Sequence, residues 1–154
     1  RQLGIPRKQA ASYIEAYFNR YPSIHDFMHS MVEKAKETGR AVTLFGRYRE
    51  LPDINSKNFN RRSFAERTAM NTPIQGTAAD IMKMAMIEVY RKMKAGGYKS
   101  RVLLQVHDEL VAEVVKEEKE EIAALLKETM ESVVKLKVPL VADVNEGKNW
   151  AETK

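Results

Sequence analysis

Two β-rich runs about two thirds of the way along the chain are separated by only three residues, and this spacing constrains the fold more than any other feature. The runs cover residues 102–106 and 110–115, and His107, Asp108 and Glu109 stand between them. A parallel connection needs a dozen or more residues, so the two strands must form an antiparallel hairpin. Any fold for this chain therefore has to include an antiparallel hairpin with a very tight turn.

A second hairpin is expected closer to the N-terminus. Residues 41–45 are β-rich, Gly46-Arg47 is typical of a two-residue turn with glycine first, and residues 48–51 would form the return strand. Basic residues cluster in and around this hairpin: Arg40, Arg47, Arg49, Lys57, Arg61 and Arg62. A last strand is expected at 138–144.

Apolar residues at helical spacing predict helices in the rest of the chain. One helix should begin at Pro6, a second should run from Pro22 to Gly39, and a third should cover 116–134. Two capping-box patterns, at residues 63–66 and 72–75, predict a short helix from Ser63 that Pro73 prevents from continuing, and a new helix from Thr72 to about Lys94. This last helix is apolar on most sides, so we expect it to be buried on several of them. Helices mixed with antiparallel hairpins indicate an α+β fold.

The charge of the chain is unevenly distributed. Of its 26 Lys and Arg and 21 Asp and Glu, 7 and 12 lie in residues 102–154, which leaves 19 and 9 in residues 1–101. The first part is thus strongly basic and the second acidic. A basic region suggests a polyanionic partner such as nucleic acid, although solvated helix surfaces alone could produce the same asymmetry.

Composition excludes several classes of protein. The chain has no cysteine, which rules out disulfides and thiolate metal sites and agrees with a reducing compartment. It has no apolar stretch near the roughly 20 residues of a membrane span. We therefore expect a cytoplasmic protein without a membrane partner.

The turn His107-Asp108-Glu109 is the strongest candidate for a site. Tight hairpins favour Asn-Gly or Asp-Gly because the turn needs positive φ, so His-Asp breaks a local rule, and such departures are expected at functional sites. Carboxylates on a rigid turn suit Mg²⁺, which takes oxygen ligands from one or two carboxylates and substrate phosphates. From the residues alone, a solvated polar turn is the favoured interpretation.

Arg67, Asn71 and Gln75 form a second candidate group. Arg67 and Asn71 are four residues apart and share a helix face, and Gln75 follows at the next helix start. These side chains suit minor-groove acceptors and sugar-phosphate oxygens. A surface ion pair for Arg67, a helix end for Asn71 and a capping role for Gln75 are the structural alternatives.

Two long motifs, residues 62–81 (Arg62-Ser63-Phe64-Ala65-Glu66-Arg67 through Gln75-Gly76-Thr77-Ala78-Ala79-Asp80-Ile81) and residues 104–110 (Leu104-Gln105-Val106-His107-Asp108-Glu109-Leu110), resemble those of bacterial family A DNA polymerases, the DNA polymerase I family. Thr43-Leu44-Phe45-Gly46-Arg47-Tyr48-Arg49 is similar to the hairpin between fingers and palm in that family, which more often has a third Arg where Tyr48 stands. The ending Gly147-Lys148-Asn149-Trp150 also resembles the family's C-terminus. The resemblance covers nearly all 154 residues.

The resemblance implies a role for each candidate residue. Asp108 would bind the catalytic Mg²⁺ ions, and Glu109 would support that site. His107 would hold the primer 3′ end, and Arg67, Asn71 and Gln75 would contact primer–template DNA. The partners would be primer–template DNA, deoxynucleoside triphosphates and the remainder of the polymerase chain.

The resemblance also implies what lies outside this chain. The family's other catalytic aspartate stands in an Asp-Tyr-Ser-type motif that does not occur here, so the chain would be a fragment and inactive alone. Residues 1–40 would be the helical end of the fingers, and residues 41–154 the C-terminal palm of a right-hand polymerase domain, with its catalytic hairpin at 102–115. The alternatives are a DNA-binding module without catalysis and a single-subunit RNA polymerase.

Overall fold

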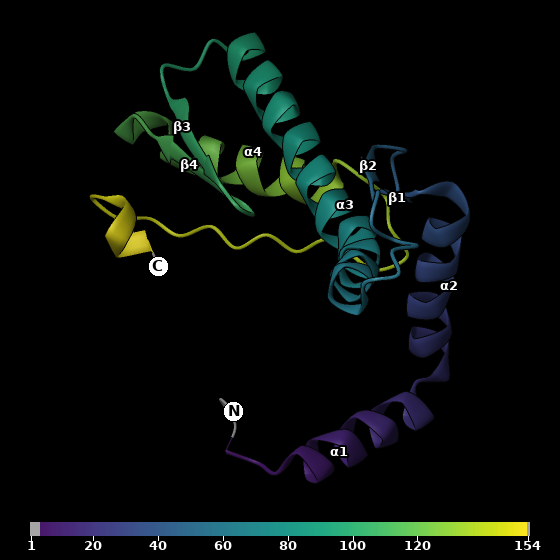
Figure 1. The fold of residues 1–154 in the computed structure, drawn as a ribbon. Coiled ribbons are helices and arrows are strands. Elements are labelled where there is room, and N and C mark those ends of the chain that lie inside the picture. The colour runs from purple at the N-terminus through teal and green to yellow at the C-terminus, as the bar shows by residue number, and fades with distance from the viewer. Residues whose placement is uncertain (1–3, 154) are drawn as a thin grey trace. The chain divides into compact units, whose positions relative to one another are not determined.

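The computed structural model describes residues 4–153, and the chain divides after Gly76 into two compact units. The first unit contains α1 (Arg7–Arg20), α2 (Pro22–Thr38), β1 (Arg40–Val42), β2 (Tyr48–Glu50) and the first part of α3 (Phe59–Ala95). The second contains the rest of α3, β3 (Arg101–Val106), β4 (Glu109–Glu113), η1 (Lys116–Glu118), α4 (Lys119–Ser132) and η2 (Trp150–Thr153) (Figure 1). Helices and two antiparallel hairpins confirm the α+β fold. None of the described helices is both long and apolar enough to span a bilayer.

The core of the first unit lies where α2, the β1–β2 hairpin and α3 meet. Its buried residues are small or aliphatic: Ala35, Ala41, Leu51, Ile54, Ala65 and Ala69. α2 starts with Pro22 at its first turn and ends at Gly39, whose left-handed φ of 71° lets its N–H reach Ala35 O at 2.8 Å. The predicted boundaries of α2 are therefore confirmed.

The first hairpin is correct in outline, but its turn is longer than predicted. β1 pairs with β2 in the register Arg40↔Glu50, Ala41↔Arg49, Val42↔Tyr48. The Thr43 N–H then donates to Arg47 O at 2.8 Å, which encloses a three-residue loop with Gly46 at φ 83°. The two-residue Gly46-Arg47 turn was wrong, because the left-handed residue comes last in the loop, as is usual for a three-residue hairpin connection.

α3 is a single helix of 37 residues, so the predicted break at Pro73 was wrong. It begins four residues before Ser63 because the Asn58 side-chain oxygen accepts the N–H groups of Asn60 and Arg61 at 3.0 and 3.3 Å. A proline inside a helix removes one hydrogen bond and costs about 3 kcal/mol. Buried alanines before Pro73, at 65 and 69, and buried residues after it, at 82, 85, 89 and 93, offset that local cost on both sides.

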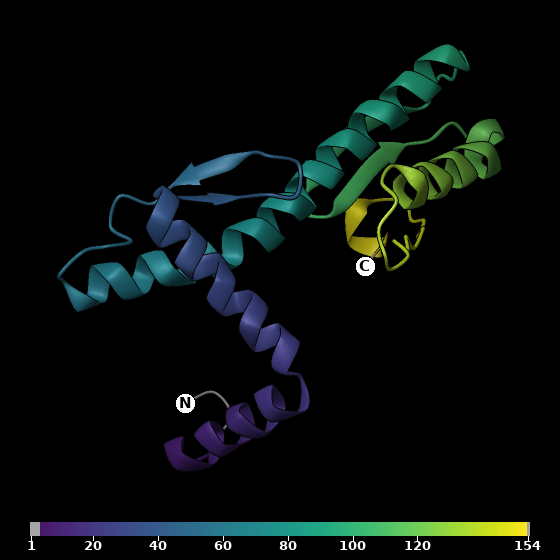
Figure 2. The same ribbon diagram turned by 90° about the vertical axis from the view of Figure 1, so that its right-hand side faces the viewer.

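The core of the second unit joins the end of α3, the β3–β4 hairpin and α4 (Figure 2). Val89, Met93 and Ile122 are buried there, with Leu110 and Leu126 packed against them. In this unit α3 buries Met82, Ala85, Val89 and Met93, whereas its Ile87 and Tyr90 are 46% and 60% exposed. The expectation of burial on several sides was therefore wrong for the described chain.

The strand expected at 138–144 does not form. Val138 and Val141 are 67% and 76% exposed, and the segment is irregular in the described structure. A β-rich run becomes a strand only when a neighbouring edge takes its backbone hydrogen bonds, and Pro139 has no N–H to offer. The segment is attached instead through the Ala142 N–H, which donates to Glu131 Oε1 at 3.0 Å.

Candidate active site and nucleic-acid interface

The β3–β4 hairpin raises His107 and Asp108 at its closed end. The last pair of the ladder is Val106↔Glu109, so the connection is only two residues long. His107 adopts a φ of 53° and is the only non-glycine residue among 4–153 with positive φ. His tolerates this region better than most residues, but glycine is the residue that adopts it without strain. The predicted rule-breaking turn is confirmed.

Asp108 and Glu109 are both exposed at this turn, and their surroundings differ. The Trp150 indole Nε1 donates to Glu109 Oε2 at 3.4 Å, so the C-terminal η2 reaches one of the two carboxylates. The Gln105 amide donates to His107 O at 2.7 Å and holds the turn from its own strand. Asp108 thus offers carboxylate oxygens on a backbone fixed from two directions.

The oxygen donors at this turn fit one edge of a Mg²⁺ site. Magnesium is commonly held by one or two carboxylates together with waters and phosphates, which the Asp108 carboxylate can join. In the part of the chain that the structure describes, no three His, Asp or Glu side chains are grouped so that they could hold a metal ion together. Asp108 would need further ligands from outside this hairpin.

Arg67, Asn71 and Gln75 lie on one stripe of α3. Because α3 continues through Pro73, the three residues follow one another at intervals of four on a single helix, where the sequence had placed them on two. All three are exposed, while Ala65 and Ala69 on the opposite side are 4% and 0% exposed in the core of the first unit. The Arg67 guanidinium donates to Ser63 Oγ at 2.8 Å, one turn earlier. The helix thus presents this polar stripe outward from a firmly packed base.

The loop of the first hairpin packs against α3 at Gly76, the residue after this stripe. The Arg47 guanidinium donates to Gly76 O at 2.9 Å, and a Cβ at Gly76 would lie 2.6 Å from Thr43 Cγ2. Gly76 is therefore required for close packing. The chain's own first hairpin occupies the space that a side chain at position 76 would need.

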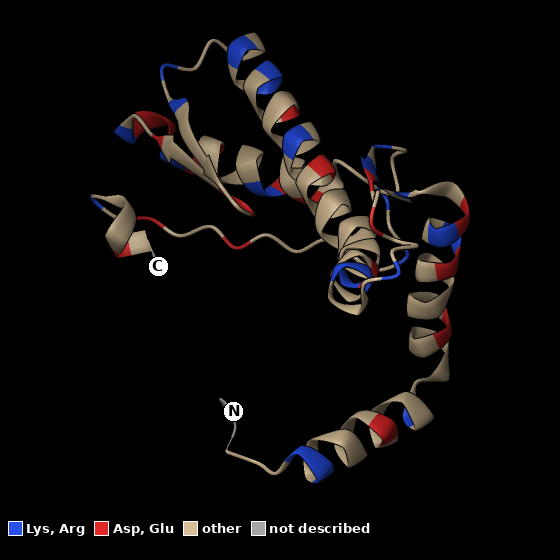
Figure 3. Ribbon diagram, viewed as in Figure 1, with Lys and Arg blue, Asp and Glu red and all other residues tan. Residues whose placement is uncertain are grey.

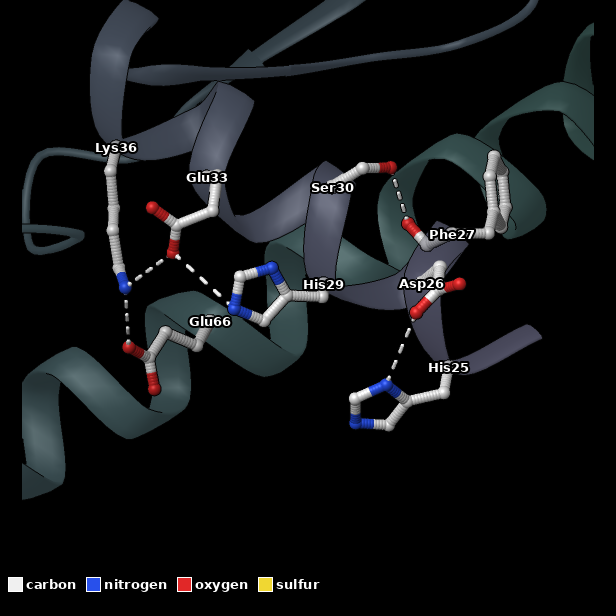
Figure 4. A network of polar contacts seen from close by, with 8 residues as sticks. All are labelled: His25, Asp26, Phe27, His29, Ser30, Glu33, Lys36 and Glu66. Atoms are coloured by element: carbon white, nitrogen blue, oxygen red, sulfur yellow. Dashed lines mark hydrogen bonds and ion pairs between the residues drawn. The ribbon is translucent and has the colours of Figure 1, made fainter. Parts of the chain in front are cut away.

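A network of charged side chains attaches α2 to the beginning of α3 (Figure 4). Lys36 Nζ lies 3.0 Å from Glu33 Oε1 and 3.7 Å from Glu66 Oε1, next to Arg67 in the chain. The hydrogen bond with Glu33 raises the pKa of Lys36, and the same bond lowers the pKa of Glu33. His29 adds a 4.0 Å contact with Glu33, and His25 a 3.6 Å contact with Asp26. Of these four pairs, Lys36–Glu66 alone joins α2 to α3, and a partly exposed pair of this kind contributes little to stability.

The two units differ in charge: residues 1–76 hold 13 Lys and Arg against 7 Asp and Glu, whereas residues 77–154 hold 13 against 14 and are nearly neutral. Figure 3 shows acidic residues at the turn end of the β3–β4 hairpin, where Asp108 and Glu109 lie, and basic residues on both strands of the β1–β2 hairpin. Arg40 pairs with Glu50 across the first hairpin at 3.0 Å, and its guanidinium lies 4.5 Å from the Tyr48 ring centroid. Tyr48, which departs from the more usual Arg, thus supports a neighbouring arginine.

Sequence reasoning missed Glu118 and Ser100. Together they connect the residues before β3 with the residues after β4, at the open end of the hairpin. Acidic residues near 117–121 are typical of a helix N-terminus, where negative charge is favourable, and nothing local distinguishes Glu118 from its neighbours. Glu118 instead accepts hydrogen bonds from the backbone before β3. No sequence pattern could indicate this contact, because Glu118 lies 18 residues after Ser100 in the chain.

Comparison with known proteins gives consistent matches over the whole chain. A sequence profile of DNA polymerase family A matches residues 1–152. DNA polymerase I of Streptococcus pneumoniae serotype 4 is 57% identical over 152 residues, which is 99% of this chain and 17% of that protein. DNA polymerase I of Caldicellulosiruptor bescii is 52% identical over 154 residues, or 100% of this chain and 18% of that protein. The chain thus spans under a fifth of the length of these relatives.

A solved structure matches the fold as well. The POL domain of Pol1 from M. smegmatis, in complex with DNA primer–template and dNTP, has a TM-score of 0.95 and 43% identity. The match covers 99% of this chain and 27% of that one.

Proposed function

The chain belongs to DNA polymerase family A, and we propose on that basis that it is the C-terminal part of a polymerase that adds deoxynucleotides to a primer 3′ end under the direction of a template. The observation that carries this proposal is the β3–β4 turn, where His107 occupies a strained backbone position and Asp108 follows it. A turn without function would be expected to carry glycine there. As part of this proposal, the polymerase acts in the cytoplasm.

Asp108 is the residue that would hold Mg²⁺, with Glu109 in a supporting position. Bound metal would supply charge stabilisation for the attack of the primer 3′-hydroxyl on the nucleotide α-phosphate. The protein's part is to hold the carboxylate still, which the hydrogen bond from Gln105 to His107 O supports. Glu109 is drawn towards Trp150 and is for that reason the less available carboxylate.

His107, Arg67, Asn71 and Gln75 would bind DNA. His107 is exposed beside Asp108, where an imidazole could hold the primer 3′ end. The stripe on α3 combines a guanidinium with two side-chain amides, which suit sugar-phosphate oxygens and minor-groove acceptors and add no negative charge. We assign residues 1–40 to the fingers and 41–154 to the palm, with catalytic hairpin 102–115, as part of the same proposal.

A DNA-binding role without catalysis is the second candidate for the isolated chain. The excess of 19 basic over 9 acidic residues in 1–101 favours it. An RNA polymerase of the single-subunit type is the third, which Glu109 and the run 75–80 argue against.

Primer extension tests these candidates. The purified 154-residue chain should not extend a primer, because the second aspartate of the family is absent from its sequence and one carboxylate cannot clamp two metals. The full-length parent should extend it with deoxynucleotides in preference to ribonucleotides. Extension by the isolated chain that is lost in Asp108→Ala would contradict the inactivity of the fragment. A preference for ribonucleotides would contradict the DNA polymerase assignment.

A further inference from the structure

Glu118 closes the open end of the β3–β4 hairpin, opposite to the turn. Its Oε1 accepts the Lys99 N–H at 2.9 Å, and its Oε2 accepts both the Ser100 N–H at 2.9 Å and the Ser100 hydroxyl at 2.6 Å. The Ser100 hydroxyl oxygen in turn accepts the Val115 N–H at 2.9 Å. The residues before β3 are thereby tied to the residues after β4 through one carboxylate and one hydroxyl.

The Ser100 hydroxyl in this clamp both donates and accepts a hydrogen bond. A serine hydroxyl has one proton to donate and lone pairs to accept, and here it donates to Glu118 and accepts from Val115. Ser100 is only 6% exposed. The Lys99 N–H and then the Ser100 hydroxyl hold the pKa of Glu118 below its usual value, so the carboxylate is ionised at neutral pH. Hydrogen bonds to an ionised acceptor are stronger than neutral ones.

The β3–β4 hairpin depends on such a clamp more than an ordinary hairpin does. Its strands are six and five residues long, and an irregularity between Val102 and Leu104 interrupts their register. The turn itself is strained at His107 and does not favour its own register. A slip of one residue would turn every side chain of a strand to the other face. The one ion pair between the strands, Arg101–Glu113 at 2.8 Å, joins side chains that are 70% and 60% exposed and contributes little.

We propose that Glu118, together with Ser100, is a positioning residue of the polymerase reaction: it fixes the register of the β3–β4 hairpin and thereby the place of Asp108. This inference rests on the proposed function. Glu118 lies ten residues after Asp108 and at the opposite end of the hairpin, so it acts through the strands and does not touch substrate.

The test uses the full-length parent polymerase with Glu118→Ala, Glu118→Gln and Ser100→Ala. Glu117→Ala is the matched control, because Glu117 is the exposed neighbour in η1. Single-turnover rates at saturating DNA and nucleotide, the Mg²⁺ concentration for half-maximal rate, the Kd for primer–template and the Tm are measured for each. Hydrogen exchange over residues 101–113 gives a readout independent of activity.

Glu118→Ala should lower the single-turnover rate roughly ten- to a hundredfold, because a displacement of about 1 Å at the reacting groups can cost about a hundredfold even when its cause lies far away, and it should raise the Mg²⁺ requirement. Primer–template Kd should stay within about twofold, since no DNA contact is removed. Exchange over 101–113 should accelerate, and combining Glu118→Ala with Ser100→Ala should add little, because both remove one clamp. Glu118→Gln, which keeps one acceptor oxygen, should be intermediate, and Glu117→Ala should resemble the wild type.

A wild-type rate and Mg²⁺ requirement in Glu118→Ala would overturn the inference, whatever happens to the Tm. Equal losses of rate and DNA affinity in Glu118→Ala and in the milder Glu118→Gln would overturn it too, because they would indicate general damage. The proposed function is tested separately by Asp108→Asn. If Asp108→Asn is inactive and Glu118→Ala is normal, only the positioning role fails; if Asp108→Asn is active, the polymerase site itself fails.

Discussion

The β1–β2 hairpin turns through Leu44, Phe45 and Gly46, whereas the β3–β4 hairpin turns through His107 and Asp108. Both turns need a left-handed residue, with φ of 83° at Gly46 and 53° at His107. Both hairpins also carry an Arg–Glu pair across the first residues of the ladder, Arg40–Glu50 and Arg101–Glu113. The two hairpins differ in the residue at the left-handed position, which is glycine in the first and histidine in the second. They also differ in the charge of the neighbouring residues.

The two turns differ in how well their residues suit the local backbone conformation, and the poorly suited turn is the one that carries the proposed site. Gly46 meets the requirement of its turn without strain, and two arginines near it support the fold, because Arg47 donates to Gly76 O and Arg40 pairs with Glu50. His107 meets the same requirement at a cost, beside a carboxylate that interacts with nothing else in its own turn. The second hairpin is then held from its open end, by Glu118, while the first is closed by a backbone hydrogen bond from Leu51 to Gly39 at 2.8 Å.

Asp108→Asn should reduce the rate of nucleotide addition more than any of the other substitutions, and it would most clearly separate the roles of the two hairpins. Asn keeps the size of the side chain but removes the negative charge that attracts a divalent cation. In the full-length parent the rate of nucleotide addition should fall roughly a thousandfold or more, with a much smaller change in DNA affinity. Glu109→Gln is the control and should cost clearly less. Near-normal single-turnover rates in Asp108→Asn would reduce the second hairpin to a polar turn.

Arg67→Ala tests the DNA-binding side of the comparison. It should weaken primer–template binding by about 1–2 kcal/mol, as loss of one good DNA contact does, and should leave the Tm nearly unchanged because Arg67 is exposed. Arg91→Ala, which removes a 72% exposed arginine further along α3, is the matched control and should bind DNA normally. Unchanged binding with a sharp fall in Tm would make Arg67 a structural residue.

Exchanging the turn residues would break the comparison directly. Gly46→Ala places a Cβ at a φ of 83° and should lower the free energy of unfolding by about 1–2 kcal/mol, although no atom lies within 4 Å of that Cβ. His107→Gly should leave stability unchanged or raise it by roughly 0.5–1 kcal/mol while slowing nucleotide addition. Denaturant unfolding and single-turnover kinetics on the parent measure both. A His107→Gly variant that is fully active would show that the two turns differ only in composition.

The smallest expected effect is a loss of stability of the β3–β4 hairpin at low pH. Because the folded pKa of Glu118 lies below the usual 4.5, its contribution to stability is present above that value and is lost as pH falls through the lowered pKa. Amide protection factors in the β3–β4 hairpin should therefore drop in this range, and Glu118→Gln should remove that part of the pH dependence. The Leu51 N–H, bonded to a backbone carbonyl, serves as the internal reference. Equal behaviour of wild type and Glu118→Gln would contradict the assignment.

Much of the local structure could be predicted because it depends on nearby residues. Pro22 and Gly39 bound α2 through backbone conformations that no distant contact has to supply. The strained backbone of the 107–108 connection could be predicted, since the shortness of the turn alone demands positive φ. Pro73 was misjudged for the opposite reason: its local penalty is real, but buried residues along α3 on both sides outweigh it.

The sequence by itself determined the α+β class, the two hairpins, the polymerase family motifs and the identity of Asp108 and Arg67 as candidates, because each depends on spacing along the chain. Only the tertiary structure decided that Arg67, Asn71 and Gln75 share one continuous helix, that Gly76 receives the loop of the first hairpin, and that residues 138–144 do not form a strand. It also decided that Glu118 reaches Lys99 and Ser100. These outcomes depend on which backbone groups and side chains meet across long separations, and the free energy of packing and hydrogen bonding there exceeds the local preferences that a sequence displays.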